Sequence, residues 1–270
     1  MDRGAAVSGY RAAPSYDEPV FGTPQERADW RAARWEALGH VLSAVSESPW
    51  ADDLVLRGSV LLRAWYGDAA RDPGDVDFVV LPSDLHARDW WSRGVLDGVE
   101  RLVTYRTGYE EIEVDGTAAE RSELWPYSDS PGVRLSMRWR SDAGPRGRIQ
   151  ADFSFGEPLP AEPDLVLVPV PGGVDGPHEV PLRCAAPGLS LAWKVRWLLA
   201  DSVPQPKDLY DAWLLAGDAR LDTGLVDGLE HFDPEQIKLL RIDARRFADA
   251  CPQADGPPER YVRELAERLA

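Results

Sequence analysis

The stretch LVLRGSVLLRAWYGDAARDPGDVDFVVL, residues 54–81, decides the fold. Leu54–Leu56 is a short apolar run that stops at Gly58 and Ser59, and helical periodicity then continues from Val60 to Tyr66. After a loop rich in Gly, Asp and Pro, residues 75–81 read as a strand whose apolar end is buried. The order predicts a strand, a tight turn, a helix and a second strand.

The segments around this stretch indicate an α+β domain. Apolar residues recur at helical spacing over 24–47, which predicts an amphipathic helix that covers one face of a sheet. Clusters of Pro, Gly, Ser and Asp mark hairpin loops between further strands, expected at residues 102–105, 111–114, 133–139 and 148–155. We therefore expect a mixed sheet in a domain that ends near residue 160.

The last third of the chain reads as helical. Residues 157–176 are dense in Pro and Gly around an apolar run at 165–170, which predicts a crossover with room for one strand. Helices are expected at residues 189–200, 206–216, 225–231, 234–250 and 259–270. The chain is thus divided into a flexible N-terminal arm (1–24), a sheet domain (25–160), a linker (161–187) and a helical domain (188–270).

Composition excludes several classes of protein. With 270 residues, 44% hydrophobic and 28% charged, the chain is typical of a globular protein rather than a disordered or fibrous one. The formal charge of −16 argues against a basic nucleic-acid coat and against docking on an anionic membrane. The sequence has no run of about 18 apolar residues and no secretion signal, and it has only two cysteines, so we expect a cytoplasmic protein.

The first candidate site combines Gly58 and Ser59 with Asp75 and Asp77. A strand-to-helix turn exposes backbone N–H groups and the positive end of the helix dipole, and both attract phosphate. Because side chains alternate along a strand, Asp75 and Asp77 share one side, about 6 to 7 Å apart. Two carboxylates beside a phosphate-binding turn are typical of a Mg²⁺ and triphosphate site.

Asp152, in the strand IQADFSF, is the third candidate metal ligand. An acid among apolar strand residues is costly unless it is paired or bound to metal. The alternative is that Asp152 faces solvent on an edge strand. If the three aspartates converge, they suit a two-metal site for in-line phosphoryl displacement.

The second candidate site lies in LSLAWKVRWLLADSVPQPKDLYDAWLL, residues 189–215. Two of the three lysines of the chain, Lys194 and Lys207, fall here beside Asp208 and Asp211. One interpretation is a surface ion pair of small energy. The other is that Lys194 or Lys207 meets nucleotide phosphates while an aspartate orients it, because an ammonium group acts as a compact point charge.

These blocks, together with IQADFSFGEPL, resemble the signature segments of the AbiEii/AbiGii-type nucleotidyltransferase toxin family, over roughly residues 30–215. The resemblance implies a polymerase-β-like nucleotidyltransferase lobe with a mixed sheet, followed by a helical C-terminal lobe. It also implies Mg²⁺ as cofactor, a nucleoside triphosphate as substrate, a tRNA acceptor end, and a cognate antitoxin as partner.

The resemblance assigns roles by position. Gly58 and Ser59 would bind the triphosphate, with Lys194, Lys207 and Asp208 as further nucleotide-binding residues. Asp75, Asp77 and Asp152 would hold metal, and Asp152 would also help to activate the attacking hydroxyl. Lys194 would neutralise phosphate charge, with Asp208 or Asp211 as the second-lobe acid. In the family, the segment before the aspartates is usually rich in Ser and Thr. The loop at 67–74 of this chain is not, and the N-terminal arm has no counterpart in the family.

The expected function is transfer of a nucleoside monophosphate from an NTP to an acceptor hydroxyl, with the 3′ end of tRNA as acceptor. A small-molecule acceptor of the antibiotic type is the alternative, since an acidic surface favours a cationic compound. A catalytically silent binding or regulatory protein is a second alternative. Arg134, Arg138, Arg140, Arg146 and Arg148 either form a local basic stripe for RNA or alternate on a solvated hairpin.

Overall fold

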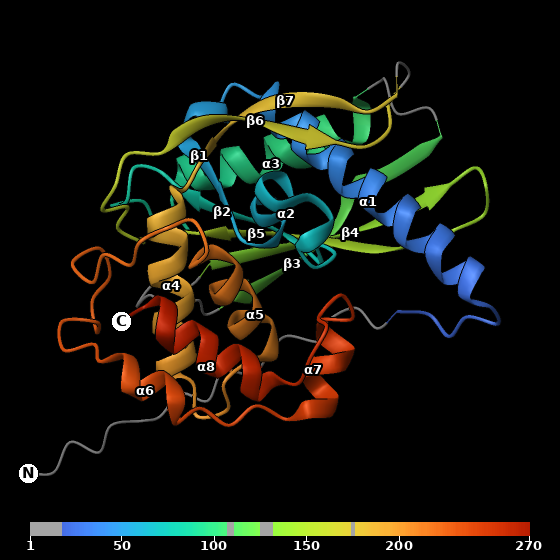
Figure 1. The fold of residues 1–270 in the computed structure, drawn as a ribbon. Helices are drawn as coiled ribbons and strands as arrows, with labels where there is room; N and C mark the ends of the chain where they lie inside the picture. The colour runs from blue at the N-terminus through green and yellow to red at the C-terminus, as the bar shows by residue number, and fades with distance from the viewer. Residues whose placement is uncertain (1–17, 107–110, 125–131, 174–175) are drawn as a thin grey trace, which may run out of the picture.

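The computed structural model describes residues 18–106, 111–124, 132–173 and 176–270 (Figure 1). Within these residues the chain forms a seven-stranded mixed sheet in the order β3-β4-β5-β2-β1-β7-β6. Its strands are β1 (Leu54–Arg57), β2 (Val76–Val80), β3 (Ile112–Leu124), β4 (Gly132–Ser141), β5 (Arg146–Ser154), β6 (Asp164–Val170) and β7 (His178–Cys184). The expected α+β fold with a mixed sheet is confirmed.

The centre of the sheet joins segments that are distant in sequence. β2 pairs antiparallel with β1 and parallel with β5, and this second pairing sets Asp77 directly opposite Asp152. Directly paired residues of adjacent strands share a face of the sheet. The register therefore brings two of the expected metal ligands to one face.

One face of the sheet is covered by α1 (Pro24–Ser46) and α3 (Trp90–Tyr105), which also pack against each other. The side chain of Thr23 caps α1 by accepting a hydrogen bond from the backbone N–H of Glu26. Fully buried residues such as Leu38 and Leu42 of α1 and Phe78 and Phe153 of the sheet form the main hydrophobic core. Asp77 and Asp152 neighbour Phe78 and Phe153 in sequence, so their side chains point to the opposite face of the sheet.

The helical lobe lies on one side of the sheet (Figure 1). It consists of α4 (Pro187–Ala200), α5 (Pro206–Leu215), α6 (Pro234–Lys238), α7 (Ala244–Ala250) and α8 (Pro258–Arg268). Its core includes Leu62 and Ala70 from the sheet lobe, and the Tyr210 hydroxyl donates to the carbonyl of Ala69 at 2.8 Å. The segment from α2 (Ser59–Tyr66) through the short 3-10 helix η2 (Gly67–Ala69) thus joins the two lobes.

The expected strand at 102–105 is wrong, because these residues are the last turn of α3. Val95, Val99 and Val103 are buried at spacings of four residues, which places Val103 on the core stripe of a helix. A short apolar run does not by itself distinguish a buried strand from a helix end. The strand expected at 111–114 is longer in the structure and reaches Leu124 because it pairs with β4.

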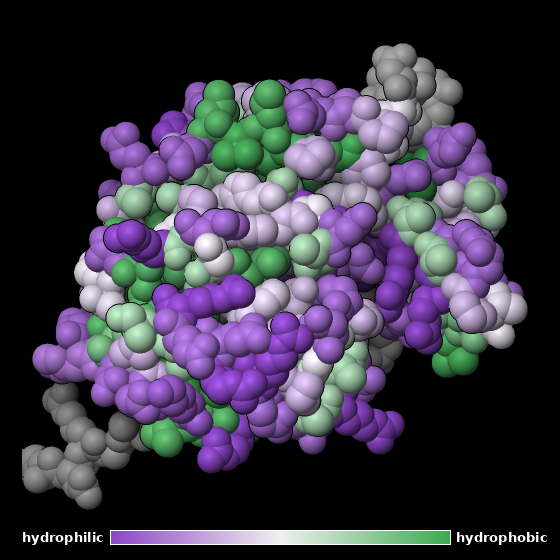
Figure 2. Space-filling model, in the orientation of Figure 1, coloured by the Kyte–Doolittle hydropathy of each residue, from purple (hydrophilic) through white to green (hydrophobic). Residues whose placement is uncertain are grey.

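The segment 161–187 contributes two strands, β6 and β7, where one was expected. β7 contains Pro181, which obscures it in the sequence, and it pairs parallel with β1 and antiparallel with β6. β6 is an edge strand with Leu165 and Leu167 exposed, and Figure 2 shows hydrophobic residues gathered in this upper part of the molecule.

Two helix expectations in the last third are wrong. Residues 225–231 form turns, not a helix, and the helix expected over 234–250 is two short helices, α6 and α7. The break has a local cause, because the side chain of Asp243 accepts from the backbone N–H of Arg246 and begins a new helix.

Three further features complete the fold. The short 3-10 helix η1 (Ala51–Asp53) precedes β1. The first 17 residues of the expected N-terminal arm lie outside the described residues. Among the described residues, no helix combines the length and the apolar character needed to cross a membrane.

Candidate active site

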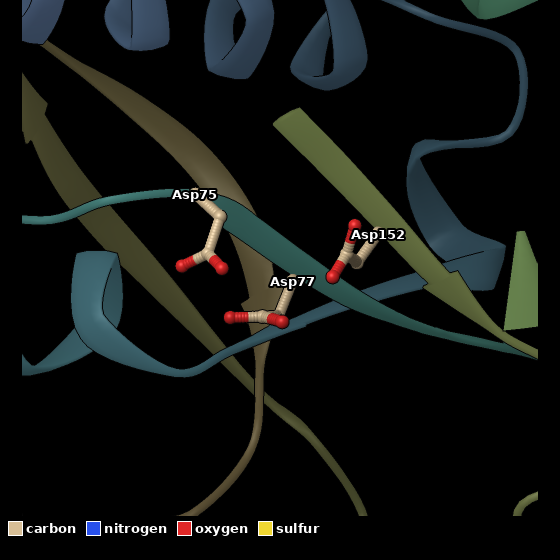
Figure 3. Close-up of side chains that lie close together, drawn as sticks. All are labelled: Asp75, Asp77 and Asp152. Carbon is tan, nitrogen blue, oxygen red and sulfur yellow. The ribbon is translucent and has the colours of Figure 1, made fainter. Parts of the chain in front are cut away.

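Three aspartates gather on the face of the sheet that α1 and α3 leave open (Figure 3). Asp77 belongs to β2, Asp75 precedes that strand by one residue, and Asp152 belongs to β5. Each offers a carboxylate oxygen, and these oxygens all lie within 4.8 Å of one another. Such a group of hard oxygen ligands suits a divalent cation such as Mg²⁺.

The electrostatics of this cluster favour a bound cation. Asp77 keeps part of its surface open but is deeply surrounded by protein, and this loss of hydration, with repulsion from Asp75 and Asp152, raises its pKa to about 7. Burial also raises the pKa of Asp152, although the guanidinium of Arg134 partly offsets that effect. Arg134 donates to both carboxylate oxygens of Asp152 at 2.7 and 2.5 Å. One arginine therefore neutralises only part of the charge.

Gly58 and Ser59 lie directly beside this cluster. Gly58 has a φ of 81°, and a Cβ atom at this position would lie 2.3 Å from Oδ2 of Asp77. The backbone can therefore approach the carboxylates only if the residue is glycine. Ser59 is the first residue of α2, and its hydroxyl is buried without a hydrogen-bond partner among the described residues. The turn thus leaves an unused polar group next to the aspartates.

Arg57 is a site residue that the sequence did not reveal. Its guanidinium is buried, donates to Glu157 at 2.5 Å and to Ser154 at 2.9 Å, and lies 4.9 Å from the ring of Trp193. It is the last residue of β1, directly before the turn at Gly58. A charged residue at the end of an apolar strand was the available signal, but arginine is so frequent in this chain that it did not stand out.

Lys194, Asp208 and Asp211 form a second cluster, inside the helical lobe. The Lys194 ammonium lies 2.7 Å from Asp208 and 2.9 Å from Asp211, and all three residues are buried. Arg71, which the sequence did not reveal, donates to both carboxylate oxygens of Asp211 at 2.8 and 2.9 Å. Burial alone would raise the pKa of Asp211, but the charges of Arg71 and Lys194 outweigh it and lower the pKa to about 2.

Lys207 differs from Lys194 in its surroundings. It is exposed at the start of α5, and its ammonium makes no ion pair among the described residues. Its positive charge nonetheless opposes the rise in the pKa of both Asp77 and Asp152, so it lies within electrostatic reach of the aspartate cluster. The structure thus separates the two lysines into one that is engaged in ion pairs and one that is available.

Comparisons with known proteins identify the family and the fold. The family described as nucleotidyl transferase AbiEii toxin, type IV toxin–antitoxin system, matches residues 40–267. The structure is similar to that of MenT4, a nucleotidyltransferase toxin from Mycobacterium tuberculosis H37Rv, with a TM-score of 0.52 and 18% sequence identity, over 92% of this chain and 96% of that one. At this identity the likeness supports the fold alone. No curated protein sequence matches the chain.

Proposed function

Because the chain belongs to the AbiEii family of nucleotidyl transferase toxins, we propose that it uses Mg²⁺ to transfer a nucleoside monophosphate from an NTP to a terminal hydroxyl of RNA. Enzymes of this family transfer NMP from NTP, and the chain is such a nucleotidyltransferase. The proposal includes four further parts: the metal, an RNA acceptor, the toxin role of this chain and a cognate antitoxin. The 3′ end of tRNA is the first candidate for the acceptor.

The aspartate cluster is the single observation that carries the proposal. Its carboxylate oxygens lie within 4.8 Å of one another, and burial together with repulsion from Asp75 and Asp152 raises the pKa of Asp77 to about 7. Asp75, Asp77 and Asp152 therefore fit divalent metal. When bound, Mg²⁺ would neutralise phosphate charge and stabilise the attacking and leaving oxygens.

The protein's own groups would position the triphosphate. Gly58 allows phosphate oxygens to approach the backbone, and the N-terminus of α2 with the free Ser59 hydroxyl provides hydrogen-bond donors. Lys207, exposed and unpaired among the described residues, is the lysine that we assign to the phosphates. We assign Lys194, Asp208 and Asp211 instead to holding α4 and α5 together, since the Lys194 ammonium is already engaged by two carboxylates.

Asp152 would serve both as metal ligand and as the group that orients the attacking hydroxyl. Its two oxygens are held by Arg134, so the carboxylate plane is fixed relative to β4 and β5. Positioning of this kind and neutralisation of phosphate charge supply most of the rate in phosphoryl transfer.

The test is incubation of the protein with each labelled NTP, Mg²⁺ and total tRNA. We expect label on RNA with the wild type and a loss of about 100-fold or more with Asp77→Asn. Asp84→Asn is the matched control, because Asp84 is an exposed aspartate outside the cluster. Label on an aminoglycoside-type compound instead of RNA would establish the small-molecule alternative. If neither acceptor is labelled, both acceptor proposals are wrong.

A further inference from the structure

A row of arginines leads away from the aspartate cluster along β4 and β5. The register pairs Arg134 with Asp152, Arg138 with Arg148, and Arg140 with Arg146. Residues two or four apart on a strand point to the same face, and directly paired residues share a face. We call Arg138, Arg140, Arg146 and Arg148 the arginine ladder; it lies on the face that carries Asp152. The ladder begins about 13 Å from Asp152 and extends to about 20 Å.

The four arginines of the ladder, together with the two acids Glu113 and Asp115 of β3, line a groove of about 520 Å³ at the end of the sheet. Trp30 and Trp139 also line this groove, with ring centroids 5.9 Å apart, and both are buried. The indole N–H of Trp30 donates to the backbone carbonyl of Arg146 at 2.9 Å, so it holds the β4–β5 hairpin in place. The ladder is therefore presented on a rigid support.

The charge of this hairpin is opposite to that of the whole chain. Residues 132–150 contain five arginines and one aspartate, whereas the formal charge of the protein is −16. Arg140 is paired with Glu113, and Arg148 with Glu120 at 2.6 Å. Among the described residues, the exposed guanidinium groups of Arg138 and Arg146 make no ion pair and no hydrogen bond. Two of the four charges are thus available to a ligand.

A chain of phosphates fits this arrangement better than a small molecule does. An acceptor whose terminal hydroxyl reaches the aspartates must leave the site along the surface, and the ladder lies on the same face at about 13 to 20 Å from Asp152. Such a distance exceeds the reach of a compact acceptor but matches several nucleotides of a single strand. Guanidinium groups also bind phosphate with two parallel hydrogen bonds.

We infer that the arginine ladder, and above all Arg138 and Arg146, binds the sugar–phosphate backbone of the acceptor RNA upstream of its terminal hydroxyl. The inference rests on the proposed function for the identity of the acceptor, but it concerns a surface outside the metal site. It also reconciles RNA binding with an acidic protein, because the basic surface needed for counterion release is confined to one hairpin.

The experiment measures binding separately from transfer. The Asp77→Asn protein, in which transfer is expected to be at least about 100-fold slower, is titrated without NTP into a short fluorescein-labelled single-stranded RNA of mixed sequence, and Kd is followed by anisotropy at several salt concentrations. In this background Arg138→Glu/Arg146→Glu is compared with Arg245→Glu/Arg263→Glu. The second pair changes the charge equally at two exposed arginines of the helical lobe that have no ion pair within the described part of the chain. Melting temperatures establish that both double variants are folded.

We expect the ladder variant to weaken RNA binding and to reduce the slope of log Kd against log salt by about 1.4, or 0.7 for each lost phosphate contact. The same substitutions in the wild-type background should raise KM for RNA and leave KM for NTP unchanged. Equal affinity and equal slope in the two double variants would overturn the inference, even if RNA is labelled. Binding through the ladder without any labelling would support it while the proposed function fails. If poly-glutamate competes as well as RNA, the ligand is an acidic protein segment and the inference is wrong.

Discussion

The molecule contains two clusters of carboxylates, one buried and one partly buried, that differ in their balance of charge. In the helical lobe, Asp208 and Asp211 are matched by two cations, Lys194 and Arg71. In the sheet lobe, Asp75, Asp77 and Asp152 have one directly bound cation among the described residues, Arg134. We call them the balanced and the unbalanced cluster.

The same side chain therefore behaves in opposite ways in the two clusters. The pKa of Asp211 is lowered to about 2 because Arg71 and Lys194 outweigh its burial, whereas the pKa of Asp77 is raised to about 7 by burial and by neighbouring carboxylates. A balanced cluster is complete without a ligand, and removing one of its members leaves an uncompensated buried charge. An unbalanced cluster suits a bound cation, because a cation removes the repulsion between its members.

Neutralising one acid in each cluster should show this difference most strongly. Asp211→Asn leaves the buried charges of Arg71 and Lys194 without their shared partner, so the free energy of unfolding should fall by about 3–5 kcal/mol. Asp77→Asn relieves repulsion and should leave that free energy unchanged or higher. Urea denaturation without metal measures both, with Asp84→Asn as the surface control. If Asp77→Asn proves to be the more destabilising variant, the assignment of the clusters is reversed.

The pH dependence of metal binding should sharpen the comparison. The folded pKa of Asp77 lies above its unfolded value, so without metal the free energy of unfolding falls as the pH rises from about 4 to about 7. Mg²⁺ must displace the bound proton, so its apparent affinity should be about tenfold weaker at about pH 6 than at about pH 8.

The measurement is the increase in melting temperature that Mg²⁺ causes at the two pH values. The increase should be larger at the higher pH in the wild type, and this difference should disappear in Asp77→Asn. An equal increase at both pH values in the wild type would contradict the raised pKa of Asp77.

The smallest expected effect distinguishes the two lysines. Lys207→Ala removes an exposed charge near the unbalanced cluster, so KM for NTP should rise about fivefold without a change in melting temperature. Lys194→Ala breaks the balanced cluster and should lower the melting temperature instead. Steady-state kinetics and thermal melting of both variants test this division. A change in KM confined to Lys194→Ala would restore that lysine to the phosphate site.

The sequence predicted the parts of the molecule that are encoded locally. The strand, turn, helix and strand of residues 54–81 follow from the spacing of apolar residues and from Gly58. Asp152 could be proposed as a third ligand because an acid is conspicuous among apolar strand residues. The convergence of the three aspartates then depended on the parallel pairing of β2 with β5, which the structure shows.

The features that the sequence missed depend on contacts between distant segments. Arg71 meets Asp211 across 140 residues, and Arg57 meets Glu157 across 100. No local pattern announces such partners, least of all in a chain where almost every basic residue is arginine. β7 was missed for a related reason, since its parallel pairing with β1 outweighs the unfavourable Pro181.

The strand order also has a consequence for synthesis in the cell. β5, which carries Asp152, pairs with β2 more than 70 residues earlier, and β7 must then close the other side of β1. Pairing across such separations forms late in folding. A nascent chain still threaded through the ribosome therefore lacks the three-aspartate cluster until β5 has emerged.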